Sequence, residues 1–167
     1  MVQVKYCAKH TACDVTGKLT DTAVALLREL QGMRLLQAGS HGGLQAEVTD
    51  FFAWVRTVVQ YNPSAGWVAG VVGVHPSGLA LGDKKLQDDI YARDADTWVV
   101  SPYAPFGRAK AVEGGYVLSG EWPYSTGTDH YTWTVLGGML TNTNTNDKAC
   151  SRRRFLRRLP ALRSASA

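Results

Sequence analysis

Cysteine is scarce in this 167-residue chain, and its three copies, an odd number, argue against a disulfide framework. A reducing compartment is the simpler interpretation, so we expect a soluble protein in the cytoplasm. No apolar run approaches the roughly 18 residues of a membrane-spanning helix. The first residues also lack the basic-then-apolar order of a signal peptide. The sequence therefore predicts no membrane partner and excludes a disulfide-rich secreted domain.

Several common catalytic motifs are missing as well. The four histidines are scattered, and no pair of cysteines has C-x2-C spacing, so we predict no metal site. The chain has no P-loop and no G-x-G-x-x-G after an expected strand. It has no G-x-S-x-G elbow either, so nothing supports a serine hydrolase of that type.

Charged residues make up only 19% of the chain, and the net charge of +4 is unevenly distributed. Six of the 18 basic residues follow residue 150, whereas no acidic residue follows Asp147. Residues 1–150 therefore carry 12 basic and 14 acidic groups, a net charge of −2. An Arg-rich tail can bind phosphate backbones. We favour the alternative of a solvated extension without a nucleic-acid partner.

The first half of the chain has apolar residues at helical spacing. A helix is predicted from Thr20 or Asp21 to about Gly32, and a second helix is ended by Asn62-Pro63. Residues 64–82 are apolar and long enough for a helix that bends at Pro76. A short amphipathic helix follows, with Leu86, Ile90 and Tyr91 on its inner side. The expected core includes Leu26, Leu30, Phe51, Phe52 and Val55.

The second half changes to strand-like alternation. Strands are predicted at 97–101, from Ala109, at 116–118 and at 131–136, with a hairpin turn at Gly114-Gly115. Helices followed by strands favour an α+β fold with an antiparallel β-domain. We expect four segments: an unpatterned stretch (1–19), a helical domain (20–96), a partial β-domain (97–148) and an Arg-rich tail (149–167).

Aromatic and hydroxyl residues cluster where two predicted strands end. Ser101-Pro102-Tyr103 closes one strand, and the segment 122–127, WPYSTG, closes another. Such segments suit a planar ligand with hydrogen-bonding heteroatoms, and a flavin ring is one example. Ordinary packing at the rim of a sheet is the alternative that composition alone leaves open.

Four stretches resemble one protein family in both order and spacing: LLQAGSHGGLQ (35–45), SAGWVAGVVGVH (64–75), SPYAPFGRAKAVEGGYVLSGEWPYSTGTDH (101–130) and WTVLGGML (133–140). On these stretches, residues 19–140 resemble the N-terminal part of flavin-dependent monooxygenases in the acyl-CoA dehydrogenase superfamily. The similarity is to oxygenase components that hydroxylate phenols, such as the 3-HSA and p-hydroxyphenylacetate hydroxylases. The resemblance implies an N-terminal helical domain, a middle β-domain and a C-terminal helical bundle, in a homotetramer.

The resemblance also implies which residues contact the flavin. These residues are Trp67, Ser101, Pro102, Tyr103, Tyr124, Ser125 and Thr126. Ser125 or Thr126 would stabilise the reactive flavin, and His75 and Tyr103 are weaker candidates for lining the substrate pocket; His75 as a core residue is the alternative. The chain departs from the family in having Tyr124 and Thr126 where relatives often have Trp and Ser, and Ala38 where they usually have Pro.

The implied reaction uses O2 and reduced FMN or FAD, delivered by a separate flavin reductase, to hydroxylate a phenolic substrate at the ortho carbon. An acyl-CoA dehydrogenase-like FAD oxidoreductase is the alternative within the superfamily, although its carboxylate base would come from beyond this region. The resemblance stops near Cys150, where the Arg content rises abruptly. We therefore expect a truncated relative, without the C-terminal bundle, whose tail arises from a shifted reading frame. An inactive fragment and an Arg-tail nucleic-acid binder are the remaining alternatives.

Overall fold

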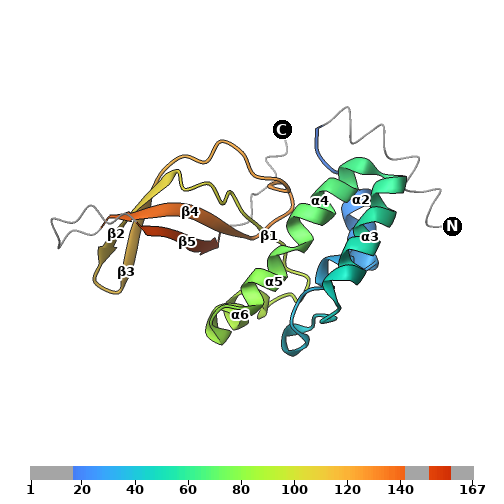
Figure 1. Cartoon of the computed structure of the whole chain (residues 1–167), viewed down its shortest axis with the longest axis horizontal. Helices are drawn as coiled ribbons and strands as arrows, with labels where there is room; N and C mark the ends of the chain where they lie inside the picture. Colours follow the sequence, from blue (N-terminus) through green and yellow to red (C-terminus); the bar gives the residue numbers. More distant parts are fainter. Residues whose placement is uncertain (1–16, 142–150, 159–167) are drawn as a thin grey trace. The chain divides into compact units, whose positions relative to one another are not determined.

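The computed structural model describes residues 17–141 and 151–158 and divides the chain into two compact units. We call the first the helical unit; it contains the described residues up to Trp98 and the short segment Thr126–Tyr131. The second, the sheet unit, contains Val99–Ser125 and the described residues from Thr132 onward. Figure 1 labels the elements of both. Most of the expected unpatterned stretch 1–19 and about half of the expected tail 149–167 lie outside the described residues.

Five α-helices form the helical unit: α2 (Asp21–Glu29), α3 (Val48–Tyr61), α4 (Pro63–Gly73), α5 (His75–Ala80) and α6 (Lys84–Tyr91). Two 3-10 turns, η1 (Gly32–Arg34) and η2 (Gly39–His41), lie between α2 and α3. Of the two predicted cap candidates for α2, Thr20 is the one used, since its Oγ1 accepts from the Ala23 N–H. Asn62, predicted only to end α3, also caps α4, because its Oδ1 accepts from the Ala65 N–H. Of these described helices, none is long and apolar enough to cross a membrane.

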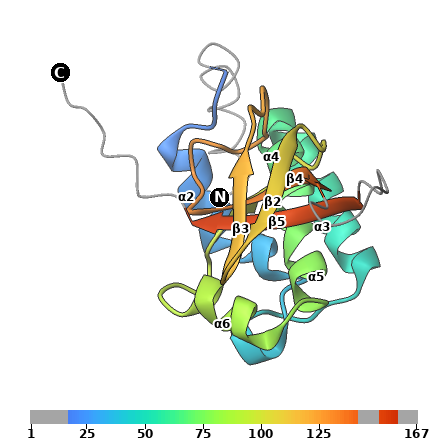
Figure 2. The same cartoon turned by 90° about the vertical axis from the view of Figure 1, so that its left-hand side faces the viewer.

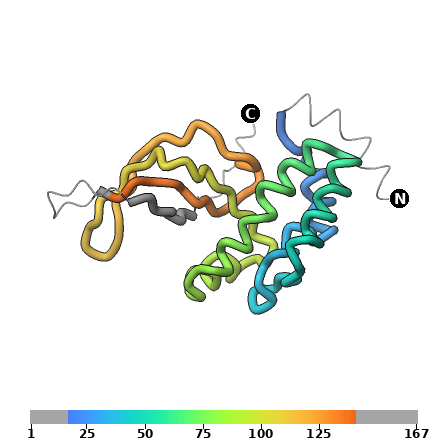
Figure 3. Tube along the Cα trace, viewed as in Figure 1, coloured from blue at the N-terminus to red at the C-terminus, as the bar shows by residue number. Residues whose placement is uncertain are grey.

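The apolar stretch 64–82 is helical but interrupted. α4 ends at Gly73 and α5 begins at His75, with Pro76 in the first turn of the new helix, where its missing N–H costs nothing. α4 lies beside α3, and the two are adjacent in the tube of Figure 3. A Cβ on Gly66 would lie 2.8 Å from the Val59 Cα, so this glycine is what allows the two helices to approach closely.

The core of the helical unit is smaller than the sequence predicts. Leu26 and Phe51 are buried as expected, with 8% and 1% of their surface exposed. Leu30 and Phe52 are instead 41% and 56% exposed, and Val55 is half-buried, so these three assignments are wrong. The apolar stripe on α3 is wider than the part of it that α4 and the turns cover.

The sheet unit contains five strands: β1 (Val99–Val100), β2 (Gly107–Val112), β3 (Gly115–Ser119), β4 (Trp133–Thr141) and β5 (Ser151–Arg158). β2 and β3 form the predicted hairpin, which Figure 2 shows clearly, with Gly114 at φ +77° in its turn. β5 pairs with β4 from Trp133 to Leu140, so β1 and β2 must share the other edge of β4.

The expected α+β class with helices before strands is confirmed, but the strand pairing is mixed. β1 and β2 both run parallel to β4, whereas the β2–β3 and β4–β5 pairs are antiparallel. The parallel pairs arise because the long connection from β3 returns the chain to the far side of β2. A strand within the Arg-rich segment was not predicted, since four consecutive charged or polar residues do not alternate with apolar ones.

Candidate functional site

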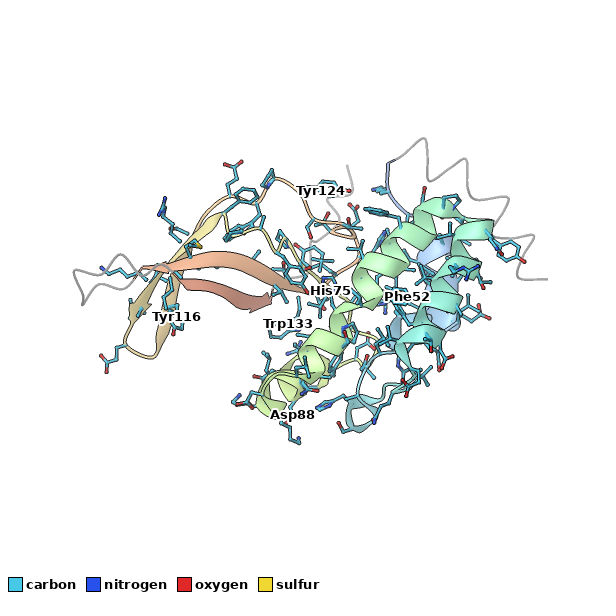
Figure 4. The ribbon with its side chains drawn as sticks, in the orientation of Figure 1. Phe52, His75, Asp88, Tyr116, Tyr124 and Trp133 are labelled. Carbon is cyan, nitrogen blue, oxygen red and sulfur yellow. The ribbon has the colours of Figure 1, made fainter. Side chains whose placement is uncertain are left out.

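The residues that the resemblance assigns to the flavin are divided between the two units. Trp67, His75 and Thr126 belong to the helical unit, whereas Ser101, Pro102, Tyr103, Tyr124 and Ser125 belong to the sheet unit. Figure 4 labels His75 on the helical unit and Tyr124 on the loop after β3. Within each unit the structure brings some of these residues together, and their convergence on one surface stays a prediction.

In the helical unit, Trp67 and Thr126 are in contact although 59 residues separate them in the chain. The indole Nε1–H of Trp67, on α4, donates to Thr126 Oγ1 at 3.3 Å. This separation is well within the ~15 Å that a ring-sized ligand contacting both residues requires. A hydroxyl has one donor and two acceptor sites, so accepting from Trp67 leaves the Thr126 O–H able to donate to a ligand.

Thr126 begins a turn that was not predicted from the sequence. The turn continues through Gly127, at φ +81°, to Tyr131, and the His130 N–H donates to the Gly127 carbonyl at 3.2 Å. His130 Nε2 is buried and has no hydrogen-bond partner among the described residues. Partial burial also raises the pKa of Tyr131. The run GTDH, with a glycine at a positive-φ position, was the available sequence signal for this turn.

In the sheet unit, both candidate segments are hydrogen-bonded to the same residue of β4. The Gly137 N–H donates to the Pro102 carbonyl at 3.0 Å. The Gly137 carbonyl accepts from Trp122 Nε1–H, also at 3.0 Å. Gly137 thus connects the segment after β1 with the segment after β3. This role of Gly137 was not predicted, although two glycines inside a strand indicate a close backbone approach.

Trp122 is itself held between two glycines. A Cβ on Gly107 would lie 2.5 Å from the Trp122 ring, and one on Gly120 would lie 3.1 Å from it. The indole therefore packs where neither neighbour has a side chain, with its N–H directed at β4. This packing fixes the start of the segment that continues to Tyr124 and Ser125.

The aromatic candidates are exposed, while the hydroxyl of Ser125 is not. Trp67 and Tyr124 are 64% and 74% exposed, and Tyr103 is 45% exposed. Ser125 Oγ is buried without a hydrogen-bond partner in the described part of the chain, and such an orphaned group suits a ligand that can hydrogen-bond to it. His75 is only 3% exposed, as a core histidine would be, and its pocket role stays a prediction. Among the described residues, no cluster of three His, Cys, Asp or Glu is placed to bind a metal.

Comparison with curated proteins shows clear relatives, although no family model matches the chain. The chain is 42% identical over 130 residues to a pigment production hydroxylase of Rhodococcus erythropolis, which covers 78% of this chain and 33% of the relative. It is 40% identical over 121 residues to a flavin-dependent monooxygenase, oxygenase subunit HsaA, of Rhodococcus jostii, covering 72% of this chain and 32% of the relative. This chain is a homologue of flavin-dependent hydroxylase oxygenase components. It spans about a third of the length of these curated relatives.

Solved structures support the same relationship. The 3-HSA hydroxylase from Rhodococcus sp. RHA1 superposes with a TM-score of 0.86 and 32% identity, over 94% of this chain and 41% of that one. The HsaA monooxygenase from M. tuberculosis gives a TM-score of 0.87 and 32% identity, over 94% of this chain and 42% of that one. At 24% identity, XiaF from Streptomyces, solved with FADH2 and glycerol, shares the fold at a TM-score of 0.85, over 93% and 39% of the two chains.

Proposed function

We propose that this chain carries part of the reduced-flavin site of an oxygenase component that hydroxylates a phenolic ring, a steroid-derived one being the candidate suggested by its relatives. The observation that carries the proposal is the hydrogen bond from Trp67 to Thr126. It joins two residues that the family resemblance assigns independently to the flavin. The homology to hydroxylases of phenols and resorcinol supports the substrate class.

The residues present fit a flavin in chemical type. A flavin ring offers a flat face and a row of nitrogen and oxygen atoms along its edge, and binding sites for it need both aromatic and hydrogen-bonding groups. Trp67, Tyr103 and Tyr124 supply aromatic surface, and Ser125 and Thr126 supply hydroxyls. Ser101 and Pro102 would line the ring from the segment after β1.

Reduced flavin, when bound, supplies the two electrons with which O2 delivers one oxygen atom to the phenol and the other to water. The chain's own contribution is positional. Trp67 donates to the Thr126 oxygen, which leaves the Thr126 O–H able to donate to a ligand. Aromatic surface at the proposed site would help to exclude water from the reacting edge of the flavin. We also propose a flavin reductase as the partner that delivers the reduced flavin. The odd number of cysteines favours a reducing compartment, and we propose the cytoplasm.

An anaerobic titration of the purified chain with reduced FMN and reduced FAD tests the proposal. Because Trp67 and Tyr124 are mostly exposed, a site lined by them is open to solvent and would enclose only part of a flavin ring. We therefore expect dissociation constants in the range of about 1 μM to 1 mM. Trp67→Phe keeps the ring but removes the N–H, which should weaken binding about fivefold. Thr126→Ser should bind like wild type, and Thr126→Val should behave like Trp67→Phe.

Phe52→Leu is the matched control, because Phe52 is an exposed aromatic residue of the helical unit with no assigned role. Equal binding by Trp67→Phe and wild type would contradict the flavin assignment. If the titration confirms flavin binding, hydroxylation of a phenol with a supplied reductase would extend the proposal to catalysis. Acyl-CoA-dependent reduction of a dye would instead favour the dehydrogenase-like alternative.

A further inference from the structure

Gly137 occupies a distinctive place in β4. On one edge of that strand, β1 pairs with Trp133 and Thr134, and β2 pairs from Gly138 onward. Gly137 therefore lies in the interval between the two parallel partners. The chain that connects β1 to β2, residues 101–106, passes this interval, and the Pro102 carbonyl accepts the Gly137 N–H there.

Only glycine fits at this position. A Cβ on Gly137 would overlap the carbonyl oxygen of Tyr103 and lie 2.6 Å from that of Ala104. Both obstacles are backbone atoms, which cannot rotate away as the end of a flexible side chain can. Any larger residue would push the segment after β1 away from β4. The glycine is thus a steric requirement of the close approach as well as a hydrogen-bonding partner.

The second bond of Gly137 reaches the other candidate segment. Its carbonyl accepts from the Trp122 indole, whose ring packs against Gly107 and Gly120. Trp122 comes two residues before Tyr124 and three before Ser125. One residue of β4 consequently fixes both stretches of the sheet unit that carry the assigned hydroxyl and aromatic groups.

We propose that Gly137 is a positioning residue that sets the placement of Ser101–Tyr103 and Trp122–Ser125 together. Trp122 is the side chain through which Gly137 holds the second of these segments. The inference that this placement serves flavin rests on the proposed function. The anchoring itself does not, because it follows from contacts within the sheet unit. Loss of the anchor should therefore loosen both segments at once while leaving the helical unit unchanged.

Amide hydrogen exchange on three variants of the full chain tests the anchor without any ligand. Trp122→Phe keeps a ring over the two glycines but removes the N–H donor, so exchange in 120–125 should become about 2- to 10-fold faster. Gly137→Ala should accelerate exchange in both 101–104 and 120–125 by more than about tenfold. Gly115→Ala is the control, because a Cβ there meets nothing within 4 Å, and both segments should exchange as in wild type.

The flavin titration on the same variants tests the purpose of the anchor. We expect Trp122→Phe and Gly137→Ala to bind reduced flavin at least about threefold more weakly than Gly115→Ala, with the helical circular dichroism signal and its melting unchanged. If Gly137→Ala fails to fold, Trp122→Phe still decides the question. Unchanged exchange of residues 120–125 in Trp122→Phe would overturn the anchor.

The two proposals fail in different ways. Faster exchange with unchanged flavin affinity would overturn the positioning role while leaving flavin binding intact. Absence of flavin binding by wild type up to millimolar concentration would overturn the proposed function for this chain, and with it the purpose assigned to Gly137. Faster exchange in that case would still support Gly137 as the anchor of the two segments.

Discussion

The helical unit and the sheet unit differ in how they are stabilised. The helical unit has fully buried side chains, among them Leu27 and Phe51. The segment just after α6 is also attached to α2 by side-chain interactions. Arg28 donates to both the carbonyl and the carboxylate of Asp96 at 2.7 Å, and its guanidinium lies 4.8 Å from the centre of the Trp98 ring. Burial and side-chain bonds thus reinforce one another in this half of the chain.

The β2–β3 hairpin of the sheet unit depends far more on its backbone, whereas β1 and β4 contribute buried residues such as Val100 and Val135. In the β2–β3 hairpin only Gly107 and Ala109 are buried, and β3 exposes every residue except Leu118, which is half-buried. Apolar burial is the main favourable term in folding, so this hairpin contributes little to the free energy of unfolding. The segment that carries Tyr124 and Ser125 follows this hairpin, so the hydrogen bond from Trp122 to Gly137 is an important constraint on its position.

The largest effect should come from Phe51. Phe51→Ala removes a side chain that is 1% exposed in the helical core and should lower the free energy of unfolding by about 3–5 kcal/mol. Phe52→Ala, on the next residue, should cost less than about 1 kcal/mol because Phe52 is 56% exposed. Urea denaturation followed by circular dichroism measures both. Similar losses of stability for the two variants would contradict the burial of Phe51 and the exposure of Phe52.

Tyr91 should make the helical unit sensitive to alkaline pH. Burial raises the pKa of Tyr91 to about 12, against about 10 when the chain is unfolded. Between these values the unfolded state releases the proton first, so stability falls as the pH rises from 10 to 12, by up to about 2–3 kcal/mol. Tyr91→Phe isolates this effect. The Tyr91 hydroxyl is buried without a partner among the described residues, so the variant should be as stable as wild type at pH 8. At pH 11 its free energy of unfolding should fall less than that of wild type.

A pair of glycines tests the contact between α3 and α4. Gly66→Ala places a methyl 2.8 Å from the Val59 Cα and should destabilise the unit by about 1–3 kcal/mol. Gly70→Ala meets only Val55 at an ordinary 3.5 Å and should be neutral or stabilising by up to about 1 kcal/mol, because alanine favours a helix. Thermal melting of both variants measures the difference. Equal melting temperatures would argue against the close helix contact.

The comparison also shows what the sequence could predict. Local signals were accurate: Thr20 caps α2, Asn62-Pro63 separates α3 from α4, and Gly114 makes the hairpin turn. Each depends on residues a few positions apart. Periodicity overestimated the core, because it identifies an apolar face but not how much of that face another element covers, as Phe52 illustrates.

Contacts between distant segments were beyond these local rules. The parallel pairing of β1 and β2 with β4, and the two bonds of Gly137, join residues from three parts of the chain. For the candidate site, resemblance named Trp67 and Thr126, and only the three-dimensional structure shows that they touch. Gly137 and the turn at His130 had no assigned role before their contacts were known, and Trp122 was included only as part of the candidate segment 122–127.

The smallest expected effect is in the sheet unit and gives the most direct comparison. Val117→Ala, on the β3 edge where Val117 is 58% exposed, should change the free energy of unfolding by less than about 0.5 kcal/mol. The same substitution at Val58, which is 4% exposed on α3, should cost about 2 kcal/mol because it removes buried methyl groups.

Amide exchange resolves the two units separately and is the appropriate measurement for this pair. Val58→Ala should accelerate exchange across α3 and α4, because these helices share one core. Val117→Ala should leave both the helices and the anchored segments unchanged, since β3 buries almost nothing that the substitution could remove. A loss of stability at Val117 as large as that at Val58 would show that the exposed face of the hairpin is covered in solution. The contrast between the side-chain core of the helical unit and the backbone-held β2–β3 hairpin would then not hold.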